Sequence, residues 1–399
     1  MAAPLSPPRR TLAVLCLASL GWAFSFGVGA TLAAPLLADA GYDKTTIGLN
    51  TSIYYLGVAV ASVALPWLMR KSGRNCIVAG IGIDALTVAL YPWIGDVVGW
   101  FLLRLVGGIA TALCLIPMET MVNRNAPPER RARDFGCYAF CVALGVGLGP
   151  VVGLPLYPIA PKLAFALGGV AALAAAALAW WGLPARDLGM EEDTGAAPLS
   201  VAANVLSFGS AWIQGFLEGG MIAFLSVYLI ALSYTEASAG LLIGVLFLGV
   251  IAFQVPGAWI ADRVGRLRVL LGCHAVVLVG MVCLPLYAGP VWLCVWLFLV
   301  GACCAALYPL GLAVLGERVP RAAMGKANAW YLACNCAGSL SGPVVMGLVV
   351  EWWGWHGLFT AGAVAVVLVA VGGLAWEHLR GAKARQRQDA VCTESSRAA

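Results

Sequence analysis

The sequence predicts an all-α membrane protein with twelve transmembrane helices in two pseudo-symmetric six-helix bundles. Three observations support this prediction. Of the 399 residues, 61% are hydrophobic and 11% are charged, whereas a soluble domain carries about 25% charged residues. Twelve apolar runs are long enough to cross about 30 Å of hydrocarbon as helices. The second half of the chain also repeats landmark residues of the first, as chains built from two homologous bundles do.

The internal repeat relates the two halves at a nearly constant offset. It predicts an N-terminal bundle over residues 1–183, a linker over 184–202, a C-terminal bundle over 203–378 and a tail over 379–399. The pairs separated by 192 residues are Trp67 and Trp259, Gly73 and Gly265, Arg74 and Arg266, and Pro117 and Pro309. The pairs separated by 193 residues are Gly145 and Gly338, Gly149 and Gly342, and Pro150 and Pro343.

The twelve runs begin near residues 11, 45, 75, 98, 134, 162, 204, 237, 267, 290, 324 and 353. The first extends from Thr11 to about Leu37, which is too long and too rich in glycine for the apolar segment of a cleaved signal peptide. The strands of a membrane barrel would be shorter and would alternate in polarity. We therefore expect twelve helices, of which the first is retained.

The connections between the runs are short, apart from one. Residues 184–198 are polar, acidic and rich in Gly and Pro, which is typical of a hinge between two halves. The external connections are too short for a separate domain, so we expect the function to lie in the membrane core. From His378 onward the chain is basic, and we expect a solvated cytoplasmic extension that is disordered at its end.

The positive residues are distributed unevenly between the two sides of the predicted helices. Of the 24 Lys and Arg residues, Lys44 and Lys162 fall in external connections and Arg104 falls inside the fourth run. The other 21 fall on the side of the N-terminus. Because cytoplasmic segments are enriched in Lys and Arg, this distribution predicts that both termini are cytoplasmic in a multi-pass protein of the cell (inner) membrane.

The connection between the eighth and ninth runs carries the strongest motif. Residues 258–266 read AWIADRVGR, which resembles the G-x-L-A-D-R-x-G-R-K loop signature of the major facilitator superfamily. The resemblance implies the major facilitator fold and a gating loop in which Asp262 latches the halves together on the cytoplasmic side. The gating residues that it implies are Asp262, Arg263, Gly265 and Arg266, with Gly73 and Arg74 in the first half.

The corresponding loop of the first half departs from the signature. Residues 66–75 read PWLMRKSGRN, with Arg70 where the family has an acidic residue. We therefore expect Asp262 alone to be the gating carboxylate.

Two further motifs resemble those of the same family. Residues 104–110, RLVGGIA, resemble its R-x-x-x-G motif, and residues 145–153 resemble its G-x-x-x-G-P-x-x-G motif, which is associated with antiporters. Glycines four residues apart allow helices to approach closely, and a proline bends a helix, although simple packing explains the same pattern equally well. The residues of these helix-bend motifs are Gly145, Gly149, Pro150 and Gly153, with Gly338, Gly342 and Pro343 in the second half.

Shorter fragments resemble the YcaD-like bacterial branch of the family. They read LEGG at 217–220, QVP at 254–256, LYPL at 307–310 and GER at 316–318. This branch does not identify a substrate.

Ionisable residues inside the membrane are costly, so each one needs a reason. In the family fold, the first, fourth, seventh and tenth helices line a central cavity, which implies that Arg104 and Glu218 face each other across it. We predict that Glu218 carries the coupling proton, with Arg104 tuning it and Asp84 as a second proton site. A static ion pair is the alternative for Arg104 and Glu218, a structural role is the alternative for Asp84, and packing is the first interpretation of His274. Glu119, near the end of the fourth run, is interpreted as a helix-end charge, with gating as the alternative. The predicted substrate-cavity residues are Gln214, Glu218, Arg104, Phe26 and Tyr308.

The resulting functional hypothesis is a secondary transporter that exports a small organic solute by proton antiport. Uptake of a small metabolite, including an anionic one, by proton symport or facilitated diffusion is the alternative, and a transport-incompetent sensor is the third. The sequence has no G-x-x-x-x-G-K-[ST] or H-E-x-x-H motif, and its 13 cysteines lack metal-ligand spacing. We expect no enzymatic activity, cofactor, metal or nucleic acid. The expected partners are a small-molecule substrate, protons and the lipid bilayer, with one chain sufficient for function.

Overall fold

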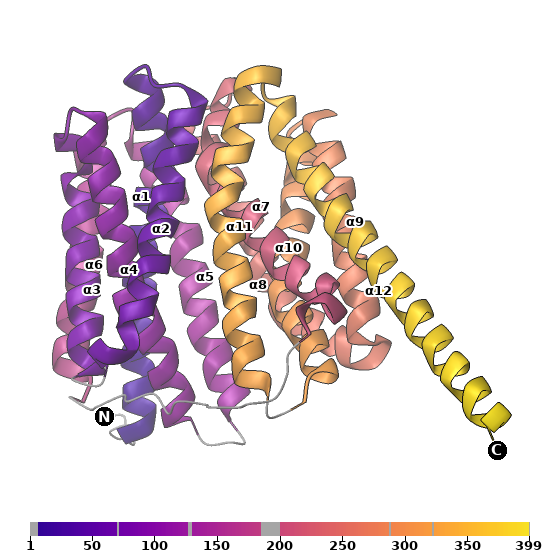
Figure 1. The fold of residues 1–399 in the computed structure, drawn as a ribbon. Coiled ribbons are helices and arrows are strands. Elements are labelled where there is room, and N and C mark those ends of the chain that lie inside the picture. The colour runs from indigo at the N-terminus through magenta and orange to yellow at the C-terminus, as the bar shows by residue number, and fades with distance from the viewer. Residues whose placement is uncertain are drawn as a thin grey trace.

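The computed structural model describes residues 7–69, 72–126, 130–184, 200–286, 289–320 and 323–398. Within these ranges the chain is helical and contains no strand (Figure 1). The long helices are α1 (Pro7–Asp39), α2 (Lys44–Met69), α3 (Gly73–Leu90), α4 (Val97–Asn125), α5 (Arg131–Leu156), α6 (Pro161–Gly182), α7 (Val205–Ala231), α8 (Glu236–Val264), α9 (Arg266–Cys283), α10 (Pro290–Arg318), α11 (Met324–Trp353) and α12 (His356–Ala398). Short 3-10 turns are η1 (Tyr91–Trp93), η2 (Val201–Ala203) and η3 (Leu284–Leu286).

The membrane character predicted from composition is confirmed. Eleven of the described helices are long and apolar enough to cross a membrane. This set includes every long helix except α2. Each long helix begins within four residues of its predicted start.

Local chemistry defines several helix starts. Asp96 accepts a hydrogen bond from the Gly99 amide at 2.8 Å, and thereby caps α4. Pro161 and Pro290 occupy the first turns of α6 and α10, where their missing N–H groups would have no intrahelical partner.

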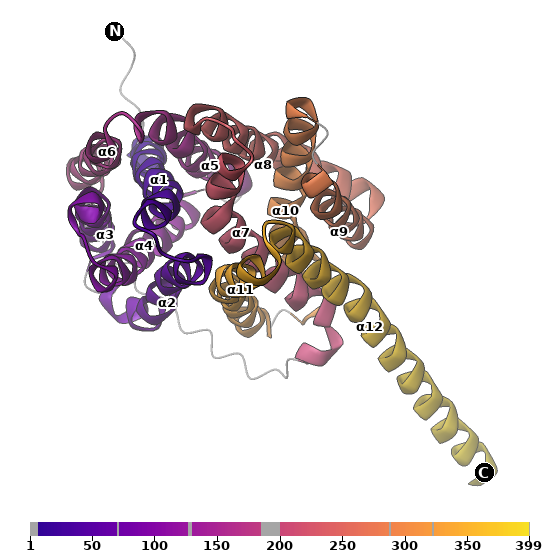
Figure 2. The same cartoon turned by 90° about the horizontal axis from the view of Figure 1, so that it is seen from above.

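The helices form two bundles related by the predicted repeat. Figure 2 shows α1 to α6 gathered on one side and α7 to α12 on the other, with α2 beside α11 and α5 beside α8. The repeat is also visible in the helix lengths, because α3 and α9 both have 18 residues, and α4 and α10 both have 29. The prediction of two pseudo-symmetric six-helix bundles is therefore confirmed.

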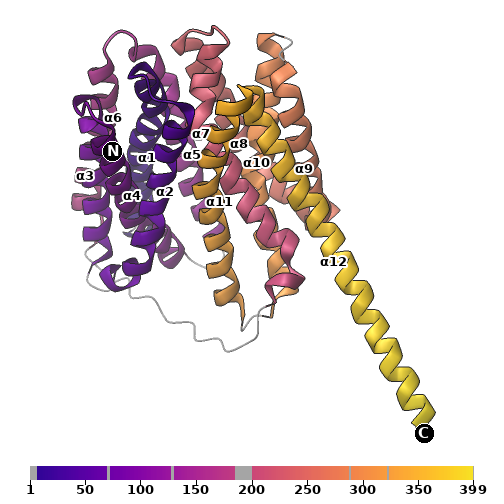
Figure 3. The same cartoon turned by 45° about the horizontal axis from the view of Figure 1, so that its top comes forward.

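The two ends of the molecule are distinguishable. We call the end where α1 begins the terminal side, and the end that carries residues 40–43, 94–96, 157–160, 232–235 and 354–355 the far side (Figure 1). The C-terminal part of α12 runs outward from the side of the bundle, and its end lies toward the terminal side (Figures 1 and 3). The expectation of a disordered tail was wrong for the described residues, because α12 continues as a helix to Ala398.

Most of the predicted linker lies outside the described residues, as do Arg70 and Lys71 of the first-half loop. The described end of the linker is tied to the C-terminal bundle. The indole N–H of Trp376 in α12 donates a hydrogen bond to the carbonyl oxygen of Ala202 at 2.9 Å.

The described contacts between the bundles lie in the far half of the molecule. Ser226 in α7 donates a hydrogen bond to the carbonyl oxygen of Thr31 in α1 at 3.3 Å. The Lys44 amide, at the far end of α2, donates to the Glu351 carboxylate of α11 at 3.1 Å, and the Lys44 ammonium lies 4.0 Å from the same carboxylate. The bundles therefore close against each other on the far side.

Candidate functional site

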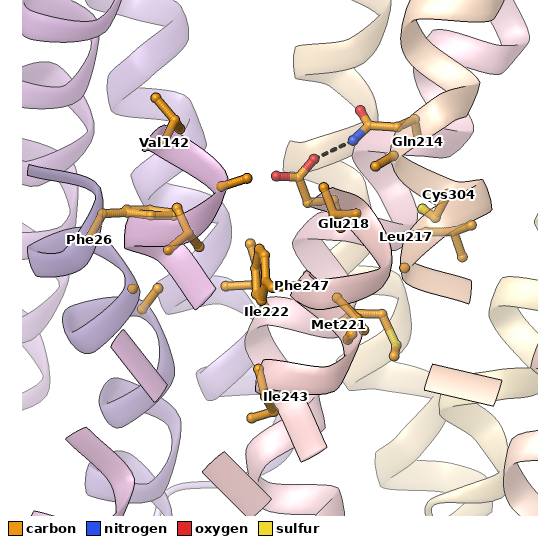
Figure 4. A pocket seen from close by; sticks show the side chains of 18 of the residues that line it. Phe26, Val142, Gln214, Leu217, Glu218, Met221, Ile222, Ile243, Phe247 and Cys304 are labelled. Atoms are coloured by element: carbon orange, nitrogen blue, oxygen red, sulfur yellow. Dashed lines mark hydrogen bonds between the residues drawn. The ribbon is translucent and has the colours of Figure 1, made fainter. Parts of the chain in front are cut away.

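A cavity of about 340 Å³ lies between the two bundles. Its walls come from α1, α4 and α5 of the N-terminal bundle and from α7, α8, α9 and α10 of the C-terminal bundle. Most lining side chains are apolar or aromatic, and a small number are polar (Figure 4). An apolar cavity of this size with a few polar groups is typical of a small-molecule site.

Glu218 provides a carboxyl group near the middle of this cavity. It is the fourteenth of the 27 residues of α7, so it lies about as far from one end of the helix as from the other. Figure 4 shows its side chain pointing from α7 into the space between the bundles. Its side chain is exposed to this cavity.

A chain of hydrogen bonds orients Glu218. The Gln214 side-chain amide, one helical turn earlier in α7, donates to a Glu218 carboxylate oxygen (Figure 4). Asn335 in α11 donates to the Gln214 side-chain oxygen and to the carbonyl oxygen of Ala211, the latter at 3.0 Å. Because Asn335 occupies the Gln214 oxygen, the NH₂ group of Gln214 faces Glu218.

Glu119 in α4 is a second carboxyl group on the cavity wall. The sequence suggested a charge at the end of a helix, but Glu119 lies six residues before the last residue of α4 and faces inward. Among the described residues it has no hydrogen-bond or ion-pair partner. The available signal was its place in the fourth helix, which the family resemblance already implied to be a cavity helix.

Arg104 does not line this cavity and does not pair with Glu218. Its Nε donates to the Asn50 side-chain oxygen at 3.1 Å, and its Nη2 donates to the Gly29 carbonyl oxygen at 3.2 Å. The guanidinium also lies 5.4 Å from the ring centre of Tyr91. These partners all belong to the N-terminal bundle, and they hold the side chain inside it.

Asp84 belongs to the same buried cluster. With Arg104 and Phe26 it lines a second cavity of about 20 Å³ within the N-terminal bundle. Its Oδ2 atom is buried and has no hydrogen-bond partner among the described residues. Phe26 lines both cavities, so its ring forms part of the wall between the Arg104 cluster and the space around Glu218.

Two other predicted residues lie apart from the main cavity. Tyr308 in α10 packs edge to face on Tyr331 with ring centres 4.9 Å apart, and it does not line the cavity. His274 is buried in α9, and its Nδ1 lies 2.9 Å from the Leu270 carbonyl oxygen. Phe26, Gln214 and Glu218 are thus the predicted substrate-cavity residues that the structure places on its wall.

The gating loop of the second half forms its described ion pairs within the C-terminal bundle. Arg266 lies 3.5 Å from Asp262 and 3.4 Å from Glu317 in α10, and Arg263 stacks over the Trp259 ring at 3.7 Å. Asp262 therefore does not latch the two halves together in this conformation, in which the described inter-bundle contacts are on the far side.

The glycines of the two loops differ in backbone geometry. Gly265 has φ +105°, a conformation that favours glycine, and it ends α8 and precedes α9. Gly73 is the first residue of α3 and is preceded by the N-cap Ser72. Arg74 stacks over the Trp180 ring at 4.6 Å.

The glycines and the prolines of the helix-bend motifs contact different helices. Gly145 and Gly149 of α5 pack on the backbone of α1, and Gly338 and Gly342 of α11 pack in the same way on α7. Gly153 faces Leu32 of α1, with the nearest atom 3.4 Å from where a Cβ would lie. The prolines that follow the glycines instead contact the opposite bundle through their carbonyl oxygens, Pro150 on α8 and Pro343 on α2.

Comparison with known sequences decides the family. A profile described as the Major Facilitator Superfamily matches residues 11–231 and 207–391. The chain belongs to the major facilitator superfamily. The two matches together cover nearly all of the helical region, in agreement with the internal repeat.

Relatives of this superfamily member are themselves described as uncharacterized MFS-type transporters. YfkF of Bacillus subtilis is 25% identical over 348 residues, covering 84% of this chain and 88% of the relative. YcaD of Salmonella dublin is 25% identical over 331 residues, covering 80% and 84%. The predicted resemblance to the YcaD-like branch is confirmed at this level of identity.

Solved structures of superfamily transporters share the fold. A variant of the nucleoside transporter NupG superposes with a TM-score of 0.78 at 15% identity, covering 92% of this chain and 99% of the other. A bacterial homologue of the lysosomal transporter Spinster superposes with a TM-score of 0.70 at 15% identity, covering 95% and 96%. The superfamily match and the description of its relatives as transporters make the protein a multi-pass membrane transporter of the secondary class, with a small-molecule substrate.

Proposed function

We propose that this protein is a proton-coupled antiporter that exports a small organic solute across the cell (inner) membrane, with Glu218 as the proton-carrying group. The observation that supports this proposal best is the position of Glu218. It lies midway along α7 in the cavity between the bundles, held by Gln214. An ionisable side chain at that depth is costly in a membrane and needs a functional reason.

The proposed orientation follows from the distribution of Lys and Arg, which assigns the terminal side and both termini to the cytoplasm. On that assignment the far side is external, and the contact between Ser226 and Thr31 belongs to an external closure. The cavity is then in an inward-facing state. Rocking of one bundle against the other would break these contacts and expose Glu218 to the outside.

Arg104 and Asp84 remain part of the proposed coupling machinery as a cluster separate from Glu218. The Arg104 guanidinium lies 5.9 Å from the ring centre of Tyr54, and the ring of Phe26 on the cavity wall lies 5.5 Å from the same ring. Tyr54 and Phe26 therefore connect the cluster to the cavity wall. The loop of the first half lacks the acidic residue that Asp262 provides in the second half, which favours Asp262 as the gating carboxylate. In the outward-facing state, Asp262 would then join the two bundles. One chain contains the whole cavity, which favours function as a monomer.

The test is substrate-triggered proton movement in proteoliposomes loaded with a pH-sensitive dye and screened against a mixed library of metabolites and drugs. For an antiporter, a solute added outside drives protons out and makes the lumen alkaline. Symport, the mechanism of the uptake alternative, makes it acidic. Glu218→Gln should abolish the signal, and Glu236→Gln, at the far end of α8, is the matched control.

The assay has clear contrary outcomes. An unchanged signal in Glu218→Gln would overturn the assignment of the proton-carrying group. The absence of a signal with every compound, in protein that is folded and correctly inserted, would contradict proton-coupled transport and favour the sensor alternative.

A further inference from the structure

We propose that the cavity between the bundles binds an organic cation with an aromatic or apolar body. This inference names the substrate class of the transport function proposed above and rests on that function. It depends on the charges of the lining, on its aromatic rings and on the depths of its two carboxyl groups.

The charged groups of the cavity wall are all acidic among the described residues. Glu119 comes from α4 and Glu218 from α7, so each bundle contributes one carboxyl group. No Lys, Arg or His side chain is among the described residues that line the cavity. Arg104 is held behind the wall by Asn50 and Gly29. A cation would be attracted to both carboxylates, whereas an anion would be repelled by both with no compensating group.

Both carboxyl groups have oxygen atoms that could accept hydrogen bonds from a ligand. Gln214 donates to one oxygen of Glu218, and the other oxygen has no hydrogen bond among the described residues. Glu119 is half-buried, lines the cavity and has no hydrogen-bond or ion-pair partner among the described residues. Ionised carboxyl groups within a membrane-spanning bundle are costly, and a bound cation would relieve that cost.

The rest of the wall suits the body of such a cation. Phe26, Phe135, Tyr138 and Phe247 contribute aromatic rings from α1, α5 and α8. Figure 4 shows Phe26 and Phe247 on the two sides of the space that Glu218 faces. Aromatic faces attract cations and pack against apolar groups, so one ligand with both properties would use the whole wall.

The two carboxyl groups lie at different depths. Glu119 is six residues from the terminal-side end of α4, which corresponds to about 9 Å. Glu218 is thirteen residues from the terminal-side end of α7, which corresponds to about 20 Å. A cation that enters from the terminal side would therefore meet Glu119 first and Glu218 second.

The test compares two ions of the same shape and opposite charge. Equilibrium binding of tetraphenylphosphonium and of tetraphenylborate is measured on the purified full-length protein at one fixed pH. We expect saturable binding of the phosphonium ion and none of the borate ion. Glu218→Gln should weaken phosphonium binding about tenfold or more, and Glu119→Gln by about threefold to tenfold. Glu236→Gln removes the same charge outside the cavity and should leave the affinity unchanged.

Three results would overturn the inference: borate binding as tight as phosphonium binding, no saturable phosphonium binding, or phosphonium binding that is unaffected in both cavity variants. Melting temperatures of the variants identify any that fail to fold, and the aspartate substitutions Glu218→Asp and Glu119→Asp, which retain the charge, should restore part of the affinity.

The result can be separated from the outcome for the transport function. If the phosphonium ion does not bind but a neutral or anionic compound triggers proton movement that requires Glu218, the transport proposal stands and this inference fails. If the phosphonium ion binds through both glutamates but no compound moves protons, the cation site stands and proton-coupled transport fails.

Discussion

Gly240 of α8 packs directly on the carbonyl oxygen of Pro150 in α5, and a Cβ atom at Gly240 would lie 2.5 Å from that oxygen. The repeat reproduces this contact in the other half. Gly48, which precedes Gly240 by 192 residues, packs on the carbonyl oxygen of Pro343 in α11. Each bundle thus presents a proline carbonyl to a glycine of the other bundle. The two contacts form a pair of matching closures on the far side.

Substitution of either glycine should loosen this closure. We expect Gly240→Ala and Gly48→Ala to shift the protein away from the conformation described here, because a methyl group cannot fit against a backbone carbonyl without separating the helices. Hydrogen exchange monitored by mass spectrometry should then be faster at the far ends of α2, α8 and α11. Gly82→Ala in α3 is the control, because no atom of the described residues lies within 4 Å of where its Cβ would lie. Equal exchange in all three variants would contradict the closure.

Asn335 should act on ligand binding through Gln214. Asn335→Ala removes the donor that orients the Gln214 amide toward Glu218. We expect phosphonium affinity to fall about fivefold, which corresponds to about 1 kcal/mol and to the loss of one hydrogen bond. Combining Asn335→Ala with Gln214→Ala should cost little more than Gln214→Ala alone, as measured in a double-mutant cycle. Fully additive losses would show that the two residues act independently.

Arg104 should affect stability more than ligand affinity. Arg104→Lys loses the Nε donor to Asn50 and the planar contact with the Tyr91 ring. We expect a loss of about 2 kcal/mol in the stability of the N-terminal bundle, observed as a lower melting temperature in detergent. The affinity of the folded fraction for the phosphonium ion should stay within about twofold of the affinity of the protein without the substitution. A large loss of affinity at an unchanged melting temperature would indicate that Arg104 takes part in ligand binding.

Asp262 should control the rate of transport and leave binding intact. In this conformation its partner is Arg266 of the same loop, and its side chain is 68% exposed. Because such an exposed pair contributes little to stability, Asp262→Asn should leave the melting temperature and phosphonium affinity unchanged. If the latch forms in the opposite state, the same variant should slow substrate-triggered proton movement about tenfold. An unchanged rate of proton movement in Asp262→Asn would contradict a gating role for this residue.

The fold was predictable because its determinants are local and repetitive. A run of apolar residues must form a helix in hydrocarbon, since no water is present to bond its backbone groups. The starts of α10 and α11 were predicted to the residue for this reason. The placement of Glu218 and Gln214 together also followed from the sequence, because residues four apart in a helix share one face.

The sequence could not predict which face of a helix an isolated charge occupies. Arg104 and Glu119 both belong to α4, and the prediction placed Arg104 in the cavity and Glu119 at a helix end. The structure differs on both points, because it holds Arg104 inside the N-terminal bundle and places Glu119 on the cavity wall. The rotation of α4 about its axis is determined by its packing on α2 and α3, and that packing depends on side chains far away in the sequence.

The sequence by itself therefore determined the twelve helices, their two-fold repeat and the pairing of Gln214 with Glu218, because hydrophobic length and helical period act over a few turns of one chain segment. The tertiary structure alone decided the acidic character of the cavity, the separation of Arg104 from Glu218 and the contacts of Gly48 and Gly240 with the opposite bundle. Those features depend on how helices rotate and approach one another. The close packing of many distant side chains determines that arrangement, and no local pattern encodes it.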